Sequence, residues 1–277
     1  MTDLSSRYKL ILAYDGTDFS GSQRQNNGRS VQQELETALE RLAGKPVEAT
    51  FSGRTDRGVH AIGQVVSVEQ FRDDLAPERL KIALNDLLPR EISVNDVSTV
   101  ANAFHPRFDA VWREYRYRIW IGSRQPLLER VTWQTRGPFE LEAAQAAATL
   151  FRGEHDLASF AGMGHGVPWS DRHHRRRGTT RNVMRCSVGV VPEWWGAAPN
   201  TGSGYEVRVV ADGFLPNMVR TMTAALADVA RGVRPQEWVS EVLQARDRRI
   251  GPKTAPPQGL IFWRVGYGDE VPDADPH

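Results

Sequence analysis

The chain has 277 residues, of which 40% are hydrophobic and 25% charged, and its formal net charge is +1. These values are those of an ordinary globular protein, and they exclude a disordered, collagen-like or coiled-coil chain. The length suffices for one large domain or two of average size. No apolar run approaches the ~20 residues of a membrane span, and the N-terminus lacks a basic region followed by an apolar one. We therefore expect a cytoplasmic protein that does not bind a membrane.

The first half of the chain alternates strand and helix patterns. Ser30 followed by Gln33 is a capping-box signature, and the helix that it opens is expected to stop at Gly44. Pro77 opens a second helix. In chain order we expect a strand over 8–14, the first helix, strands over 47–52 and 64–69, the second helix, and a strand over 93–100. This order is β-α-β-β-α-β.

The second half repeats this order with longer insertions. We expect a strand over 110–121, a helix over 141–152, strands over 182–191 and 205–211, helices over 217–231 and 236–245, and a closing strand over 259–265. Two such halves are typical of paired ferredoxin-like units, so the predicted fold is α+β with a mainly antiparallel sheet flanked by helices. We divide the chain into an N-terminal domain over 1–107, a C-terminal domain over 108–268, and a disordered acidic tail over 269–277.

Residues 53–61 contain the strongest candidate for chemistry. They read Gly-Arg-Thr-Asp-Arg-Gly-Val-His-Ala, so Asp56 stands between Arg54 and Arg57 in a connection between two predicted strands. Positive charge nearby favours the ionised, nucleophilic form of a carboxylate. Arginines also bind the phosphates of a nucleic acid. The structural alternative is a surface turn with a salt bridge.

Arginine dominates the basic residues, because lysine occupies only four positions. The segment 172–185 holds six arginines and no acidic residue, and a folded core does not hold so many unpaired charges. We therefore expect Arg175, Arg176 and Arg177 to bind phosphates of a nucleic acid. A genome rich in arginine codons and a solvated loop are the alternatives.

The loop 53–61 resembles the catalytic loop of the tRNA pseudouridine synthase A family. Further segments similar to that family follow in the family's order between residues 8 and 265. They are residues 14–16, 23–25, 30–32, 63–66, 104–108, 113–117, 159–160, 180–183, 214–220 and 259–260. A series of matches in the same order is far more specific than a single nonapeptide.

The resemblance implies a pseudouridine-synthase-type fold and a reaction. The reaction is isomerisation of uridine to pseudouridine in the anticodon arm of tRNA, at nucleotides 38, 39 and 40. Three catalytic residues are implied: Asp56 as the reacting carboxylate, Tyr115 beside the target uracil, and Arg220 as the partner of the aspartate. Arg54 is implied to displace the target nucleotide from its stack. A homodimer that binds one tRNA across both subunits is also implied.

The remaining motif residues are expected to bind substrate. They are Arg57, His60 and Gln64. Isomerisation breaks the C1′–N1 bond and forms a C1′–C5 bond, without redox change or hydrolysis. We therefore expect neither a metal nor an organic cofactor, and the single cysteine offers no C-x-x-C pair for zinc.

The chain departs from the family at one position near the first strand. The family usually has Gly-Trp-Gln there, whereas this chain has Ser22 between Gly21 and Gln23.

Two other functions are alternatives to that of a synthase. A non-catalytic RNA-binding module of ferredoxin-like type would not require the Asp56 loop. A glycosidase would need a second carboxylate in a motif, and none is present.

Overall fold

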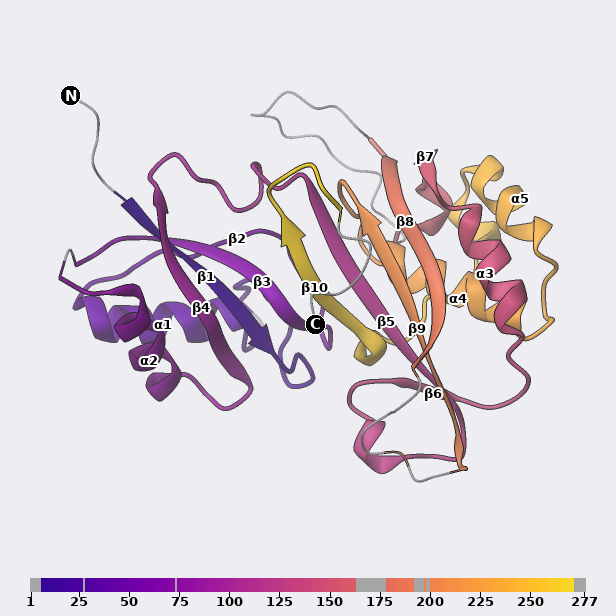
Figure 1. Cartoon of the computed structure of the whole chain (residues 1–277), viewed down its shortest axis with the longest axis horizontal. Coiled ribbons are helices and arrows are strands. Elements are labelled where there is room, and N and C mark those ends of the chain that lie inside the picture. The colour runs from indigo at the N-terminus through magenta and orange to yellow at the C-terminus, as the bar shows by residue number, and fades with distance from the viewer. Residues whose placement is uncertain are drawn as a thin grey trace. The chain divides into compact units, whose positions relative to one another are not determined.

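Figure 1 shows the computed structural model, which describes residues 6–26, 28–72, 74–162, 178–191, 197 and 200–271. The chain divides into two units. The first comprises Met1–Val111 together with Ile261–Glu270, and the second comprises Trp112–Leu260. The closing strand, which the sequence analysis grouped with the C-terminal half, thus lies with the first unit. Its pairing explains this, because Ile261 and Phe262 lie parallel to His60 and Ala61.

The first unit has the β-α-β-β-α-β order that the sequence predicts. Its elements are β1 (Ser6–Tyr14), α1 (Val31–Ala43), β2 (Thr50–Phe51), β3 (His60–Glu69), α2 (Pro77–Leu87), β4 (Ile92–Ala101) and β10 (Leu260–Gly266). The strand order is β4-β1-β3-β10, and β2 pairs with β3. All of these pairs are antiparallel except that of β3 with β10. An antiparallel strand between the two strands of a βαβ unit is the ferredoxin-like arrangement.

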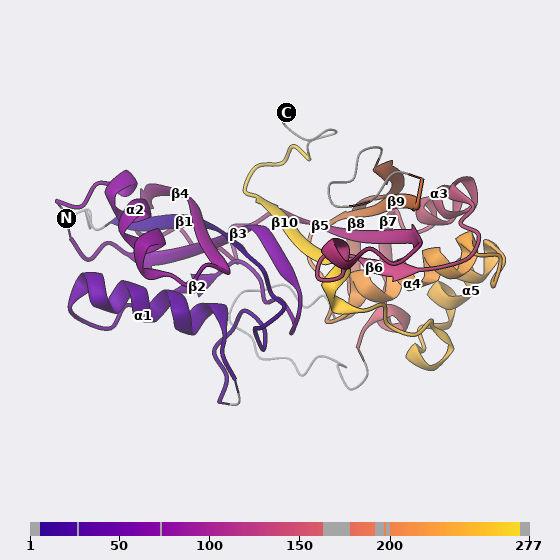
Figure 2. The ribbon, with the colours of Figure 1, turned by 90° about the horizontal axis from the view of Figure 1, so that it is seen from below.

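The predicted helix boundaries follow from their caps. Ser30 has extended backbone, with φ −129° and ψ 153°, and its hydroxyl accepts a hydrogen bond from the amide of Gln33 at 3.3 Å. This satisfies one of the free amides at the start of α1. Gly44 ends the helix at φ 70°, in the left-handed region that favours glycine. Figure 2 shows α1 running beside the strands of its unit.

The strand predicted over 47–52 is wrong in its first half, because only Thr50–Phe51 pair as β2. Both backbone groups of Ala49 are bound by side chains of α1 instead. The amide donates to Glu36 Oε1 at 3.0 Å, and the carbonyl accepts from Gln32 Nε2 at 3.2 Å. A backbone whose polar groups are already satisfied has no need of a neighbouring strand.

The second unit has the β-α-β-β-α order with three additions, the short strands β6 and β7 and the helix α5. Its elements are β5 (Trp112–Gly122), β6 (Trp133–Thr135), α3 (Leu141–Thr149), β7 (Gly153–Asp156), β8 (Thr180–Val191), β9 (Gly202–Ala211), α4 (Met218–Ala230) and α5 (Glu237–Ala245). Short 3₁₀ turns cover Pro126–Leu128, Ala158–Phe160, Arg248–Ile250 and Pro257–Gly259. The strand order is β5-β9-β8-β7, all antiparallel, and β6 pairs with β5 in parallel.

The sequence missed the short strands β6 and β7 and placed the end of α3 three residues too late. The sequence of β7, Gly-Glu-His-Asp, has no apolar alternation that would predict a strand. This short strand forms through backbone pairing with β8. The predicted fold class is nevertheless confirmed: five helices and ten mostly antiparallel strands form in the part of the chain described. None of the helices described is long and apolar enough to span a bilayer.

Candidate active site

Asp56 lies in the connection between β2 and β3, in a turn closed by a hydrogen bond from the amide of Val59 to the Asp56 carbonyl at 3.1 Å. Gly58, the third residue of this turn, has φ 78°, which a type II turn requires and which glycine adopts without strain. The Asp56 side chain is exposed, whereas Thr55 before it and Val59 after it are buried. The loop thus presents one carboxylate to solvent between two anchored residues.

Gln64 lies beneath this loop, with no exposed surface. It accepts a hydrogen bond from Ser52 Oγ at 2.7 Å and donates one to the Gly53 carbonyl at 2.9 Å. Both partners lie at the start of the loop, so Gln64 ties the loop to β3. The motif predicts that Gln64 binds substrate, whereas its hydrogen bonds are those of a residue that positions the loop.

His60 is also buried, at 5% exposure, where the loop joins β3. Its Nδ1 accepts a hydrogen bond from the amide of Gly16 at 3.0 Å and lies 3.2 Å from Asp15 Oδ1. Gly16 is required here, because a Cβ at that position would lie 2.0 Å from the carbonyl oxygen of Val59. The Asp15-Gly16 turn therefore packs directly against the end of the Asp56 loop.

Arg54 and Arg57 are exposed, as expected of residues that contact a nucleic acid. Neither forms an ion pair with the Asp56 carboxylate in the part of the chain described. Neighbouring positive charge in the sequence thus does not become a direct salt bridge. The two guanidinium groups lie on the same exposed loop as the carboxylate.

The second unit carries Tyr115 and Tyr117 on one face of β5, and the structure separates their roles. Tyr115 is 8% exposed, and its ring meets that of Phe214 edge-on at 4.9 Å between centroids. Tyr117 has no exposed surface, and its hydroxyl donates to the Pro256 carbonyl at 2.7 Å. Burial raises the pKa of Tyr117, so this phenol stays protonated. Tyr117 is therefore a core residue.

Arg220 lies in the first turn of α4, with its guanidinium held by two neutral oxygens. Its Nε donates to the Ala255 carbonyl and its Nη1 to Asn217 Oδ1, both at 2.7 Å. Asn217 has φ 61°, a left-handed conformation that few residues other than glycine adopt. The segment 214–220, which contains Phe214, thus connects Tyr115 to Arg220 within this unit.

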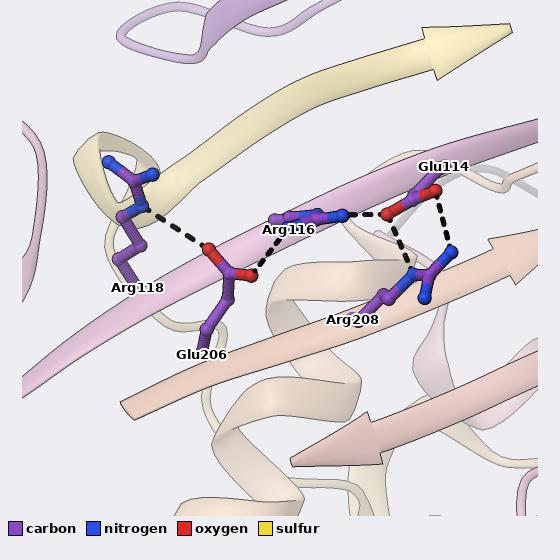
Figure 3. A network of polar contacts seen from close by, with 5 residues as sticks. All are labelled: Glu114, Arg116, Arg118, Glu206 and Arg208. Carbon is purple, nitrogen blue, oxygen red and sulfur yellow. Dashed lines mark hydrogen bonds and ion pairs between the residues drawn. The ribbon is translucent and has the colours of Figure 1, made fainter. Parts of the chain in front are cut away.

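The opposite face of β5 carries a network of three arginines and two glutamates, drawn in Figure 3. Glu114 has no exposed surface and accepts from Arg116 Nε at 2.8 Å. It also accepts two hydrogen bonds from Arg208 on β9, at 2.8 and 3.2 Å. Glu206 bridges Arg116 and Arg118 at 3.0 and 3.3 Å. This network joins β5 to β9 beside Tyr115.

No cluster of three or more potential metal ligands occurs among the described residues. Cys186 is buried in β8, and burial raises the pKa of its thiol to about 12, which agrees with an inert core residue. The predicted phosphate contacts Arg175, Arg176 and Arg177 lie outside the described residues.

The sequence patterns did not indicate the residues that support the site, above all Ser22, Tyr14 and Asn217. Tyr14 and Asn217 stand in segments that resemble the family, so their position was a signal. Ser22 stood out as a departure from the family. Ser22 and Tyr14 both bind Thr55, which lies far along the chain, whereas Asn217 binds Arg220 one turn further along α4.

Comparison with known proteins agrees with this architecture. The sequence profile of the tRNA pseudouridine synthase family matches residues 10–109 and 147–268. The chain belongs to the tRNA pseudouridine synthase family, and it is thus an isomerase.

Individual relatives match over nearly their whole length. A tRNA pseudouridine synthase A from Geobacillus sp. (strain WCH70) is 37% identical over 95% of this chain and 99% of the relative. The proteins of that name from Geotalea uraniireducens and Solidesulfovibrio magneticus are 38% and 40% identical, over 94% and 95% of this chain and 98% and 92% of theirs. The resemblance inferred from the motifs is confirmed.

Proposed function

We propose that this protein converts uridine to pseudouridine in the anticodon stem-loop of tRNA, at nucleotides 38, 39 and 40, with Asp56 as the catalytic carboxylate. One observation supports the role of Asp56 above the others. The carboxylate is exposed, while the residues that hold its loop are buried and hydrogen-bonded. A surface turn without a function has no need of such support.

The isomerisation of uridine requires a carboxylate close to the sugar or the base. The C1′–N1 bond breaks, the uracil turns, the C1′–C5 bond forms, and the proton lost from C5 is balanced by one gained at N1. A carboxylate attacks the sugar or the base, or it stabilises the cationic sugar, while water is excluded. This balance requires neither a metal nor an organic cofactor.

Tyr115 and Arg220 are proposed as the other catalytic residues. The Tyr115 ring gives the displaced uracil a surface on which to stack, and it is held by Phe214. The guanidinium of Arg220 is fixed in direction by two neutral acceptors. Such prior orientation lowers the cost of assembling the site when tRNA binds.

Arginines are the proposed contacts to RNA: Arg54 and Arg57 on the loop and Arg175, Arg176 and Arg177 on sequence grounds. His60 and Gln64 are proposed to position the loop. A homodimer and a cytoplasmic location are proposed from the family resemblance. The non-catalytic RNA-binding module is set aside because the family consists of synthases.

The decisive experiment replaces Asp56 by asparagine. The change conserves shape but removes the charge and the nucleophile, so pseudouridine formation should be abolished while tRNA affinity stays within threefold. Release of tritium from tRNA labelled at uridine C5 reports turnover. The matched control is Asp86→Asn, which neutralises an exposed carboxylate on α2. Turnover of Asp56→Asn within tenfold of the wild type would overturn the assignment.

A further inference from the structure

Thr55, the residue directly before Asp56, is held by three hydrogen bonds. Its amide donates to Ser22 Oγ at 2.9 Å, and its carbonyl accepts from the Ser22 amide at 3.1 Å. Its hydroxyl is hydrogen-bonded to that of Tyr14 at 2.8 Å. Every polar group of Thr55 therefore has a partner, and Ser22 supplies two of the three.

Ser22 is itself fixed, with 1% of its surface exposed. Its carbonyl accepts from the amide of Gln32 at 2.9 Å, one of the first amides of α1, which has no partner within the helix. Gly21 before it lies so close to the loop that a Cβ there would be 2.9 Å from the Thr55 carbonyl oxygen. Ser22 thus connects the start of α1 to the peptide bond that leads into Asp56.

A tryptophan side chain at position 22, which the family pattern described above would have there, could not accept the hydrogen bond from the Thr55 amide. An indole carries only a donor, whereas the Thr55 amide needs an acceptor. A buried amide that loses its acceptor carries the full cost of its desolvation. In this chain the serine hydroxyl is the acceptor for the Thr55 amide.

We propose that Ser22 is a positioning residue for catalysis: by binding both backbone groups of Thr55, it holds the Asp56 carboxylate in its reactive position. This inference rests on the proposed role of Asp56. Ser22 itself touches neither the substrate nor the reacting atoms. Its loss should therefore slow the chemical step and leave tRNA binding almost intact, because displacement of a reacting group lowers the rate steeply.

Tyr14 supports Thr55 from the other side. Burial raises the pKa of Tyr14 to about 12, so its hydroxyl keeps the proton. Ser22 thus binds the backbone of Thr55, and Tyr14 binds its side chain.

The test compares two serines of the same unit. Ser22→Ala removes the hydroxyl and keeps the backbone contact. Ser67→Ala is the matched control, because Ser67 is equally buried and its hydroxyl accepts one hydrogen bond, from Arg7 Nε at 2.8 Å, on the part of β3 far from the loop. We expect kcat to fall at least tenfold for Ser22→Ala and less than twofold for Ser67→Ala, with KM for tRNA within threefold in both. Ser22→Thr, which retains the hydroxyl, should recover part of the lost kcat.

Thermal unfolding of each variant separates positioning from stability. The inference is overturned if Ser22→Ala loses no more kcat than Ser67→Ala, or if its loss lies in KM alone. The Asp56→Asn variant is measured in the same assay. If Asp56→Asn keeps its turnover, the proposed function fails; if it is inactive while Ser22→Ala matches the control, only the role of Ser22 fails.

Discussion

At the scale of single residues, Asn217 shows how the backbone serves the site. Its φ of 61° costs a residue with a β-carbon roughly 1–2 kcal/mol, a cost that asparagine tolerates better than most residues. The side chain does not cap α4 and instead accepts the hydrogen bond from Arg220. Asn217 is strained and orients the candidate catalytic residue Arg220, which indicates that the strained backbone is retained because it serves the function.

We predict that two variants of Asn217 separate the strain from the hydrogen bond. Asn217→Gly tolerates the left-handed backbone but removes the acceptor, so kcat should fall with little change in stability. Asn217→Ala adds strain, and it should be less stable than the glycine variant by about 1 kcal/mol. Urea unfolding and single-turnover rates give the two quantities. Wild-type kcat for Asn217→Gly would show that this hydrogen bond does not serve catalysis.

At the scale of elements, the two faces of β5 differ in kind. One carries the tyrosines of the site and the core, and the other carries the ion-pair network of Figure 3. Arg116 lies directly opposite Arg208 in the pairing of β5 with β9, a like-charge pair that is unfavourable by itself. Glu114 lies between them and binds both. The like charges of Arg116 and Arg208 beside Tyr115 are therefore compensated by the buried carboxylate that they share.

We predict that Glu114→Leu destabilises the second unit by about 3–5 kcal/mol, because it leaves two largely buried guanidinium groups without their shared acceptor. Arg118→Ala is the control: this side chain is 29% exposed and its loss should cost at most about 1 kcal/mol. Urea unfolding followed by circular dichroism measures both.

A triple variant checks the electrostatic origin of this loss. Replacing Arg116 and Arg208 by methionine together with Glu114→Leu removes all the charges that Glu114 holds. Such a variant should regain much of the stability, since apolar residues of similar volume often replace buried ion pairs without loss. If Glu114→Leu and Arg118→Ala lowered the free energy of unfolding equally, the proposed stabilising role of Glu114 would be contradicted.

At the scale of the whole molecule, each unit buries an ionisable group in neutral form. Tyr14 lies in the first unit, and Tyr117 and Cys186 lie in the second. Burial raises the pKa of all three above their ordinary values of 10.0 for tyrosine and 9.0 for cysteine. The division into domains at residues 107 and 108 stays a prediction. In the structure the segment Ile261–Glu270, which holds most of β10, belongs to the first unit.

These three groups make the free energy of unfolding depend on pH in the alkaline range. Above about pH 9 the unfolded chain loses these protons while the folded chain keeps them, so the free energy of unfolding should fall as pH rises toward 11. Each group contributes up to about 1.4 kcal/mol for each pH unit. Urea midpoints at intervals from pH 8 to pH 11 measure the decline, which should be shallower in Cys186→Ala. An identical decline in that variant would contradict the role of the thiol.

The sequence by itself determined the features that depend on near neighbours. Alternating apolar residues predicted β1, and a serine cap and a glycine stop predicted both ends of α1. The motif around Asp56 indicated the loop, and the series of further motifs in the same order indicated the family. Each motif is a contiguous run of residues. These signals are local, and the conformational preferences of neighbouring residues can be predicted from the sequence alone.

Only the tertiary structure decided which distant residues hold the candidate site. Ser22 meets Thr55 across 33 positions, Gln64 lies under Gly53, and Glu114 binds Arg208 across 94 positions. The pairing of β10 with β3 joins His60 to Ile261, which lie far apart in the sequence. Such contacts form because buried polar groups must find partners, and the partner is whichever group the folded chain brings within reach. The sequence shows that a polar residue is present, and the fold determines what it binds.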